Sequence, residues 1–260
     1  MADIAVKGVR FNVVRLGPPP EAPRSRPPVV FVHGLIMDNL SSFYYTLAPL
    51  VARTQDVLCY DLRGHGRSER PPTGYRLEDG VDDLCGVLDA SGISGPVQLV
   101  GNSFGGTIAI ATALWAPERV SALALLEAHP ALDGWADRMV ADLQDLVAGF
   151  DDPGMRDYFR SGAPRSLRRI ISGCEALMTE TSLPTDFLAS RPTSPDCLGN
   201  VACPSLLLYG DSSDILDEAF VLEAALPDAE LRILEGCSHR LLMEAPQRVA
   251  EHLVPWLVSR

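Results

Sequence analysis

Residues 98–106 read Gln-Leu-Val-Gly-Asn-Ser-Phe-Gly-Gly, and this stretch decides the fold class. It joins an apolar run to an apolar, helix-like segment over residues 106–115, so strand, sharp turn and helix are predicted in direct succession. A turn this sharp has room only for small residues two positions before and after its apex, where Gly101 and Gly105 stand. The hydroxyl of Ser103 is therefore expected at the carboxyl end of a strand and at the start of a helix.

Length and composition narrow the class of protein. A chain of 260 residues with 47% hydrophobic residues can bury the core of one α/β domain. A formal charge of −12 disfavours nucleic acid and anionic membranes as partners. The N-terminus begins Met-Ala-Asp-Ile-Ala-Val-Lys without an apolar signal core, and we find no apolar run of the ~18 residues that a membrane span needs. We therefore expect a cytoplasmic protein with no membrane span.

The six cysteines are scattered and lack the spacing of metal ligands. In a protein of this size they are typical of reduced thiols packed in the core. We expect no metal and no cofactor.

Apolar strands alternate with helical segments along most of the chain. Residues 4–16 favour an antiparallel edge hairpin, and a Pro- and Arg-rich surface loop is predicted over 17–28. Parallel strands are then expected at 29–32, 57–60, 97–100, 120–126, 205–209 and 231–234, and helices at 41–52, 77–91 and 245–258. This alternation predicts a mostly parallel central sheet with helices on both faces.

The segment between the sixth and seventh strands breaks the alternation. It contains helix-like stretches at 136–148 and 167–177, several prolines and no strong strand pattern. We interpret residues 129–200 as a small helical lid inserted after the sixth main strand, over the edge of the sheet where such folds bind ligands. Residues 1–128 and 201–260 would then form the core; ordinary crossover helices are the alternative.

Four further strand ends carry polar or glycine-rich turns. They read His33-Gly34-Leu35, then Asp-Leu-Arg-Gly-His-Gly-Arg-Ser over residues 61–68, then Gly-Asp-Ser-Ser-Asp over 210–214, and finally Gly-Cys-Ser-His239 after the last strand. Together with the Gly-Asn-Ser-Phe-Gly-Gly turn, these motifs resemble the α/β-hydrolase family in type and in order. The resemblance covers nearly all of the chain outside the predicted lid.

This resemblance implies a nucleophile, a base and an acid. Ser103 is a poor nucleophile unless a base lies beside it, and His239, in the loop after the final strand, is the expected base. A carboxylate must hold the histidine tautomer and stabilise the imidazolium that forms. In family order Asp214 fits that role, with Asp211 as second choice in the same loop. Glu127, at the end of the strand after the serine turn, is the alternative acid, since some thioesterase-like relatives carry theirs there.

The developing negative charge of the reaction needs two backbone N–H donors. Phe104, directly after the serine at a helix start, supplies one. By resemblance Leu35, after His33-Gly34, supplies the other, with Ile36 as the fallback. We expect His33 and His65 to have structural roles in their turns.

The expected activity is hydrolysis of a carboxylic ester or thioester of a largely apolar acyl group, through an acyl-Ser103 intermediate. The serine replaces the nucleophilic aspartate of dehalogenase-like relatives, which disfavours their chemistry. The turn around Ser103 also resembles that of carbon–carbon bond hydrolases acting on ring-fission products. However, Arg240 stands where those enzymes carry an aromatic residue. Carbon–carbon hydrolysis and a binding or receptor role with little turnover stay open, as does a homodimer; the expected partner is a small-molecule acyl substrate.

Overall fold

The computed structural model describes residues 2–19, 21 and 26–260, which are built around an eight-stranded sheet in the order β1-β2-β4-β3-β5-β6-β7-β8. β1 pairs antiparallel with β2 and β2 with β4, while the remaining neighbours are parallel. The predicted mostly parallel sheet is confirmed. The strands are β1 (Ala2–Val6), β2 (Val9–Leu16), β3 (Val29–Val32), β4 (Val57–Tyr60), β5 (Val97–Asn102), β6 (Val120–Leu126), β7 (Ser205–Gly210) and β8 (Ala229–Leu234).

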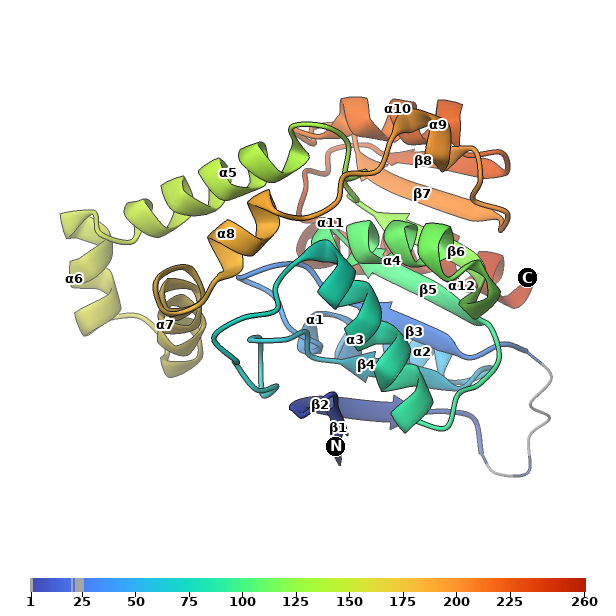
Figure 1. Ribbon diagram of the computed structural model, residues 1–260, viewed down its shortest axis with the longest axis horizontal. Coiled ribbons are helices and arrows are strands. Elements are labelled where there is room, and N and C mark those ends of the chain that lie inside the picture. Colours follow the sequence, from blue (N-terminus) through green and yellow to red (C-terminus); the bar gives the residue numbers. More distant parts are fainter. Residues whose placement is uncertain (1, 20, 22–25) are drawn as a thin grey trace.

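Helices cover both faces of this sheet (Figure 1). Successive side chains of a strand point to opposite faces, so Val30 and Val32 of β3 join one buried apolar cluster and Val29 and Phe31 join the other. The first cluster packs under α3 (Leu77–Ala90), α4 (Phe104–Trp115) and α10 (Leu216–Ala225). The second packs under α1 (Ser41–Tyr44), α2 (Ala48–Val51), α11 (Leu241–Glu244) and α12 (Pro246–Val258).

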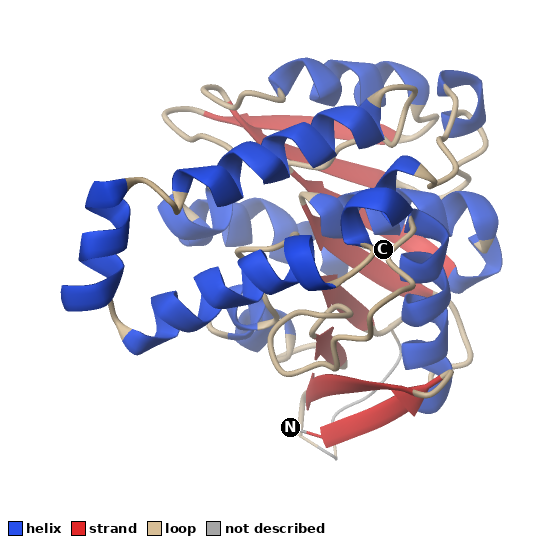
Figure 2. Cartoon of the chain, turned by 60° about the vertical axis from the view of Figure 1, so that its left-hand side comes forward, coloured by secondary structure: helices blue, strands red, loops and turns tan. Residues whose placement is uncertain are grey.

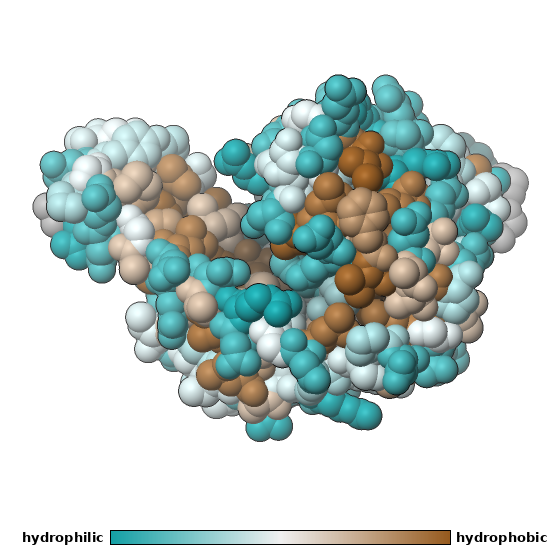
Figure 3. Space-filling view, turned by 90° about the horizontal axis from the view of Figure 1, so that it is seen from above, coloured by the Kyte–Doolittle hydropathy of each residue, from teal (hydrophilic) through white to brown (hydrophobic). Residues whose placement is uncertain are grey.

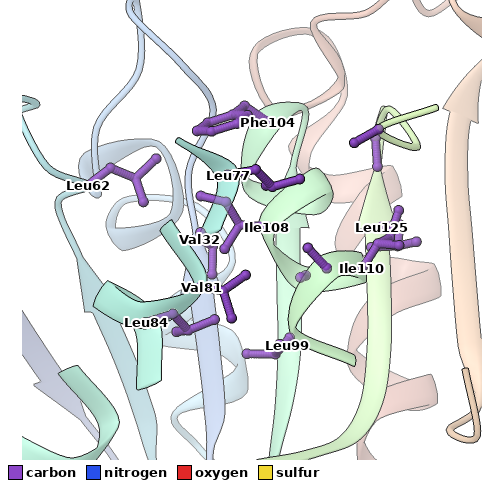
Figure 4. Packing of buried hydrophobic residues seen from close by; sticks show 14 of the residues in the cluster. Val32, Leu62, Leu77, Val81, Leu84, Leu99, Phe104, Ile108, Ile110 and Leu125 are labelled. Atoms are coloured by element: carbon purple, nitrogen blue, oxygen red, sulfur yellow. The ribbon is translucent and has the colours of Figure 1, made fainter. Parts of the chain in front are cut away.

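The first cluster fixes the helix that follows the serine turn. In Figure 4, Leu77 and Val81 of α3 and Ile108 of α4 lie together beside the strands. Every residue of α4 from Phe104 to Ala113 is buried. A helix that is apolar all round in this way is held from every side, so its first turn, next to Ser103, has a fixed position.

The prediction of one continuous helix over residues 41–52 is wrong. The structure has two short helices there, α1 and α2, with Pro49 in the first turn of α2. Proline has no N–H to donate and its ring clashes with the carbonyl four residues earlier, so a continuous helix through this point is disfavoured.

We define residues 132–192 as the helical insertion. It lies between β6 and the segment that leads into β7. It contains α5 (Trp135–Gly149), α6 (Pro153–Ser161), α7 (Arg165–Glu180) and α8 (Leu183–Leu188), followed by α9 (Pro195–Leu198). Helices α5 to α8 project beyond the carboxyl end of the sheet, whereas α9 lies beside α10 (Figures 1 and 2). The two ends of the insertion meet, because the Thr193 N–H donates to the Ala131 carbonyl at 2.7 Å.

Two further predictions concern the loop over residues 17–28 and the absence of a membrane span. The predicted loop over 17–28 includes residues 20 and 22–25, which lie outside the described residues. Within the described ranges, we find no helix that is long and apolar enough to cross a membrane.

Candidate active site

Ser103 stands at the apex of a strained turn between β5 and α4. Its φ of 50° and ψ of −120° lie outside the regions that a residue with a side chain ordinarily adopts. The flanking glycines make the turn sterically feasible. A Cβ on Gly101 would lie 2.5 Å from the Gly105 carbonyl oxygen, and one on Gly105 would lie 2.0 Å from the Val32 carbonyl oxygen. Any larger residue at these two positions would force the turn apart.

The structure brings His239 to this serine. Nε2 of His239 lies 3.2 Å from Oγ of Ser103, within hydrogen-bond reach of a base and its nucleophile. His239 follows β8 and precedes α11, so two residues 136 positions apart in the chain meet at the carboxyl edge of the sheet. The imidazole side chain is 32% exposed, which leaves it accessible to a reacting molecule.

Two carboxylates approach the other nitrogen of this ring. Nδ1 of His239 lies 3.5 Å from Oε2 of Glu127 and 3.7 Å from Oδ1 of Asp214. It makes no hydrogen bond in the described part of the chain. The distances are similar, but the surroundings differ: the side chain of Glu127 is 0% exposed and that of Asp214 is 82% exposed.

Glu127 is held in place by neighbouring strand β7. Oε1 accepts a hydrogen bond from the Gly210 N–H at 2.6 Å, and Oε2 accepts one from the hydroxyl of Ser213. These donors compensate the cost of burying a carboxylate and fix its direction. Glu127 also has a positive φ of 50°. Its side chain is therefore preset beside His239, whereas that of Asp214 is in solvent.

Asp211 lies in the same loop but serves the loop itself. Its Oδ1 accepts a hydrogen bond from the Gly236 N–H at 2.8 Å, which ties the turn after β7 to the turn after β8. This bond from the Gly236 amide holds the pKa of the Asp211 carboxyl below its usual value. Asp211 therefore has a local structural role.

The turn after β3 presents three successive backbone amides, only one of which is unoccupied among the described residues. The Gly34 N–H donates to Oδ2 of Asp38 at 2.8 Å. The Ile36 N–H donates to Nε2 of His65 at 2.8 Å, so this fallback donor is already engaged. For Leu35, as for Phe104 after the serine, the described part of the chain provides no acceptor. The two amides predicted to bind an oxyanion are thus the two that are available.

Backbone strain concentrates at this site. Four non-glycine residues in the described ranges have positive φ, and three of them are Ile36, Ser103 and Glu127. They follow β3, β5 and β6, which are adjacent in the sheet. Strained conformations of this kind persist where the surrounding structure over-determines them, typically at functional sites.

Apolar side chains from the insertion lie against the start of α4. The ring of Phe104 is 5.1 Å from that of Phe187 and 6.2 Å from that of Trp135. With Leu35 and Leu183, Phe104 and Phe187 also line a small cavity of about 30 Å³. Sequence reasoning did not identify Trp135 or Phe187, because their positions in separate helices, 52 residues apart, show no local signal.

A second histidine lies beside the first. The ring of His129 is 5.7 Å from that of His239, and its Nδ1 is 3.1 Å from Oε2 of Glu218 at the start of α10. Neither here nor in the rest of the described residues do we find a group of three or more His, Cys, Asp and Glu side chains arranged to hold a metal ion.

Comparisons with known proteins agree with this architecture. A 2-hydroxy-6-oxo-2,4-heptadienoate hydrolase of Pseudomonas putida is 36% identical over 237 residues, 84% of each chain. A 2-hydroxymuconate semialdehyde hydrolase of Pseudomonas putida is 30% identical over 216 residues, 76% of this chain and 75% of the other. The solved structure of a thermophilic esterase from Thermogutta terrifontis superposes with a TM-score of 0.77 at 23% identity, covering 99% of this chain and 98% of that one.

The protein-family model described as alpha/beta hydrolase fold matches residues 27–183, more than half of the chain. The match begins just before β3 and includes the strained turn at Ser103 and most of the insertion. The similar proteins named above are hydrolases, and the mostly parallel sheet is the one expected from the motifs. The chain therefore belongs to the α/β-hydrolase fold family.

Proposed function

We propose that this protein hydrolyses a carboxylic ester or thioester with a largely apolar acyl group, through an acyl-Ser103 intermediate. The observation that carries the proposal is the contact of Nε2 of His239 with Oγ of Ser103, at the apex of a strained turn with two unoccupied amides nearby. An activated serine hydroxyl next to backbone donors is the arrangement that acyl transfer requires.

The reaction would proceed in two halves. In the first, Oγ of Ser103 attacks the carbonyl carbon while its proton passes to Nε2 of His239, and the oxyanion accepts hydrogen bonds from the Leu35 and Phe104 amides. The carbon–oxygen or carbon–sulfur bond then breaks, and the leaving group takes the proton from His239. In the second half, His239 removes a proton from water, which attacks the acyl-enzyme; the carboxylic acid departs and the proton returns to Ser103.

We assign the acid of the triad to Glu127, which reverses the order expected from the sequence. A buried carboxylate fixed by the Gly210 amide and the Ser213 hydroxyl stabilises an imidazolium more strongly than one in water, because the local dielectric constant is lower. Asp214, at 82% exposure, is screened by solvent. A change of less than 1 Å in the position of either ring or carboxylate would close the 3.5 Å approach of Glu127 to a hydrogen bond.

The helical insertion would act as the predicted lid and as the wall of the acyl pocket. Figure 3 shows a hollow between the outlying helices and the body of the molecule, with apolar side chains in its floor. Trp135, Leu183 and Phe187 are buried against Phe104, next to the nucleophile. An apolar wall favours an apolar acyl group. This assignment keeps residues 129–200 as a lid on a core of residues 1–128 and 201–260.

Carbon–carbon bond hydrolysis is the second candidate, and the relative named 2-hydroxy-6-oxo-2,4-heptadienoate hydrolase, 36% identical, favours it. Such a substrate carries a carboxylate, which would require a free cation in the pocket. Two arginines line the small apolar cavity: Arg63 contacts Asp83 at 2.6 Å, whereas we find no ion pair for Arg76 in the described part of the chain. The pairing of Arg63 favours an uncharged acyl group, and hence the ester or thioester, whereas Arg76 is a cation that a substrate carboxylate could reach.

One set of assays separates the candidates. The protein is incubated with a fluorophosphonate, and turnover is measured with p-nitrophenyl esters, acyl thioesters and a 2-hydroxy-6-oxo-dienoate. We expect labelling at Ser103 and rapid turnover of esters or thioesters of medium chain length. Turnover of the dienoate alone would establish carbon–carbon hydrolysis, whereas labelling without any turnover would favour a binding role.

A further inference from the structure

The turn that carries Leu35 is strained and has an external support. The Leu35 carbonyl accepts a hydrogen bond from the Met37 N–H at 2.8 Å, which closes a three-residue turn around Ile36. The φ of Ile36 in this turn is 61°. A β-branched residue at positive φ is a genuine outlier, and a tight turn of this hand is rare because it is strained. Something outside the turn must therefore stabilise it.

That support is His65, from the turn after β4. Its Nδ1 lies 2.8 Å from the Arg63 carbonyl oxygen, which can only accept, so Nδ1 carries the proton. Nε2 is therefore the acceptor for the Ile36 N–H, at 2.8 Å. Burial, with a smaller contribution from the neighbouring His33 ring, lowers the pKa of His65 to about 3. The imidazole consequently stays uncharged, and able to accept, throughout the neutral pH range.

His33 makes the opposite connection. Its Nε2 accepts a hydrogen bond from the Leu62 N–H at 2.9 Å, and its Nδ1 lies 2.6 Å from the Gly34 carbonyl oxygen. The two rings are 5.3 Å apart, and both are buried. Each histidine thus binds a backbone amide of the turn that carries the other one. This reciprocal arrangement, which we call the histidine clamp (His33 and His65), ties the β3 turn to the β4 turn.

We propose that His65 is a positioning residue for the oxyanion site, which it serves by binding the Ile36 amide and so leaving the Leu35 amide as the free donor of the turn. The inference rests on the proposed function, because it takes the Leu35 amide as an oxyanion donor. The amides on either side of Leu35 are both occupied, by Asp38 and by His65. If Ile36 lost its acceptor, the strained turn would relax and the Leu35 amide would move with it.

The test compares His65→Leu, which keeps most of the side-chain volume without an acceptor, with His65→Gln, whose amide oxygen can accept from Ile36. We expect His65→Leu to lower kcat for a p-nitrophenyl ester by roughly 10- to 100-fold, with KM within about twofold, because one transition-state donor is misplaced. His65→Gln should recover most of kcat. A folded His65→Leu protein with wild-type kcat, or a folded His65→Gln protein that is equally impaired, would overturn the proposal.

The matched control is Gln98→Leu. Gln98 is equally buried and hydrogen-bonded, to Gln55 and the Leu257 carbonyl, but it lies at the opposite end of β5 from Ser103. This variant should lose stability to urea while kcat stays within about twofold of wild type. An equal loss of kcat in Gln98→Leu would show that general destabilisation lowers activity, and the positioning role would be withdrawn.

A measurement on the wild-type protein covers the case in which His65→Leu does not fold. Amide hydrogen exchange is followed by NMR in the free enzyme and in the fluorophosphonate adduct of Ser103. The Ile36 amide should be protected in both states and the Leu35 amide in the adduct alone; rapid exchange of Ile36 in the free enzyme would refute the clamp. Failure of wild type to react at Ser103 would instead contradict the proposed function and leave the Ile36 result standing.

Discussion

The turns at the carboxyl ends of β3, β4 and β5 differ from the helical insertion in how they are held. The turns are fixed by buried, directional hydrogen bonds. The carboxylate of Asp61, for example, accepts hydrogen bonds from the Leu40 N–H, the Arg67 N–H and the side-chain amide of Asn12. The insertion contributes apolar packing of residues such as Trp135 and Phe187, with hydrogen bonds to the core at its C-terminal end, where Asp186 accepts from the Gly74 and Tyr75 N–H groups. Hydrogen bonds impose one geometry, whereas apolar contacts tolerate exchange of side chains of similar volume.

This difference separates two tasks. Acyl transfer requires groups placed within fractions of an ångström, and all of the proposed reacting groups lie in turns at strand ends. The choice of acyl group requires only a wall of suitable shape, which the insertion can provide. Substitutions in the turns should therefore change the rate of every substrate, and substitutions in the insertion should change the ranking of substrates.

The largest effect is expected from Ser103→Ala. Removing the hydroxyl should lower kcat by about 10⁴-fold or more, since only the oxyanion donors and binding remain. Stability to urea should change little, because a small residue still occupies the turn. Labelling by fluorophosphonate and single-turnover kinetics provide the measurement; residual turnover above one hundredth of wild type in a folded protein would contradict the assignment of the nucleophile.

The next effect concerns the acid. Glu127→Gln should lower kcat by roughly 10²- to 10⁴-fold, because the imidazolium of His239 loses its buried counter-charge. Asp214→Asn should lower kcat less than about tenfold, as expected for an exposed carboxylate. Both isosteric variants are assayed for kcat across pH 5–9. If Asp214→Asn proves the more damaging of the two, the acid returns to the loop after β7.

Changes in the insertion should act on substrate preference. Phe187→Leu places a smaller side chain in the wall beside Phe104 and so enlarges the pocket. It should shift the ratio of kcat/KM for long over short acyl chains by about tenfold. Leu188→Ala, on the same helix but 53% exposed, is the matched control and should leave the ratio unchanged. The ratio is measured with a series of p-nitrophenyl esters. A uniform loss of kcat/KM at every chain length would show that the insertion also positions the reacting groups.

The smallest effect concerns stability and pH. The pKa of His65 is about 3 in the folded protein and about 6.5 in an unfolded chain, so between these values the unfolded state binds a proton that the folded state excludes. The free energy of unfolding should be unaffected by this group above pH 6.5 and fall as the pH decreases, by at most about 1.4 kcal/mol per unit. Urea titrations of His65→Gln should show a shallower decline, and those of exposed His252→Gln the wild-type slope; an unchanged slope in His65→Gln would argue against a buried, uncharged imidazole.

Much of the core could be predicted from local patterns. The parallel strands are short apolar runs bounded by polar turns, and the structure places all six where the sequence indicates them, with ends that differ by up to two residues. The turn at Ser103 was predictable because sterics demand glycine at 101 and 105. The prediction of one helix over residues 41–52 was wrong because the hydrophobic periodicity continues through Pro49, whereas the helical hydrogen bonding does not. Proline has no N–H to donate.

The burial of Glu127, on which we base its proposed role as the acid, was beyond sequence reasoning for a different reason. It depends on the lateral order of the strands, which places the end of β6 next to the turn after β7. Because of this strand order, the Gly210 amide and the Ser213 hydroxyl can donate hydrogen bonds to the buried carboxylate of Glu127. The spacing from Gly210 to Asp214 indicates a loop of the right length but says nothing about which of its side chains faces solvent.

The hydrogen bond between Ala131 and Thr193 has a consequence for how such proteins diversify. Because the insertion leaves and rejoins the core at one point, its length and sequence can change without moving the chain on either side. Lengthening a closed loop of this kind adds little entropic cost, about 0.6 kcal/mol for each doubling. If the insertion selects the acyl group as we propose, exchanging residues 132–192 between relatives, together with residues 72–78 that hydrogen-bond to them, would transfer a substrate preference to the same catalytic core.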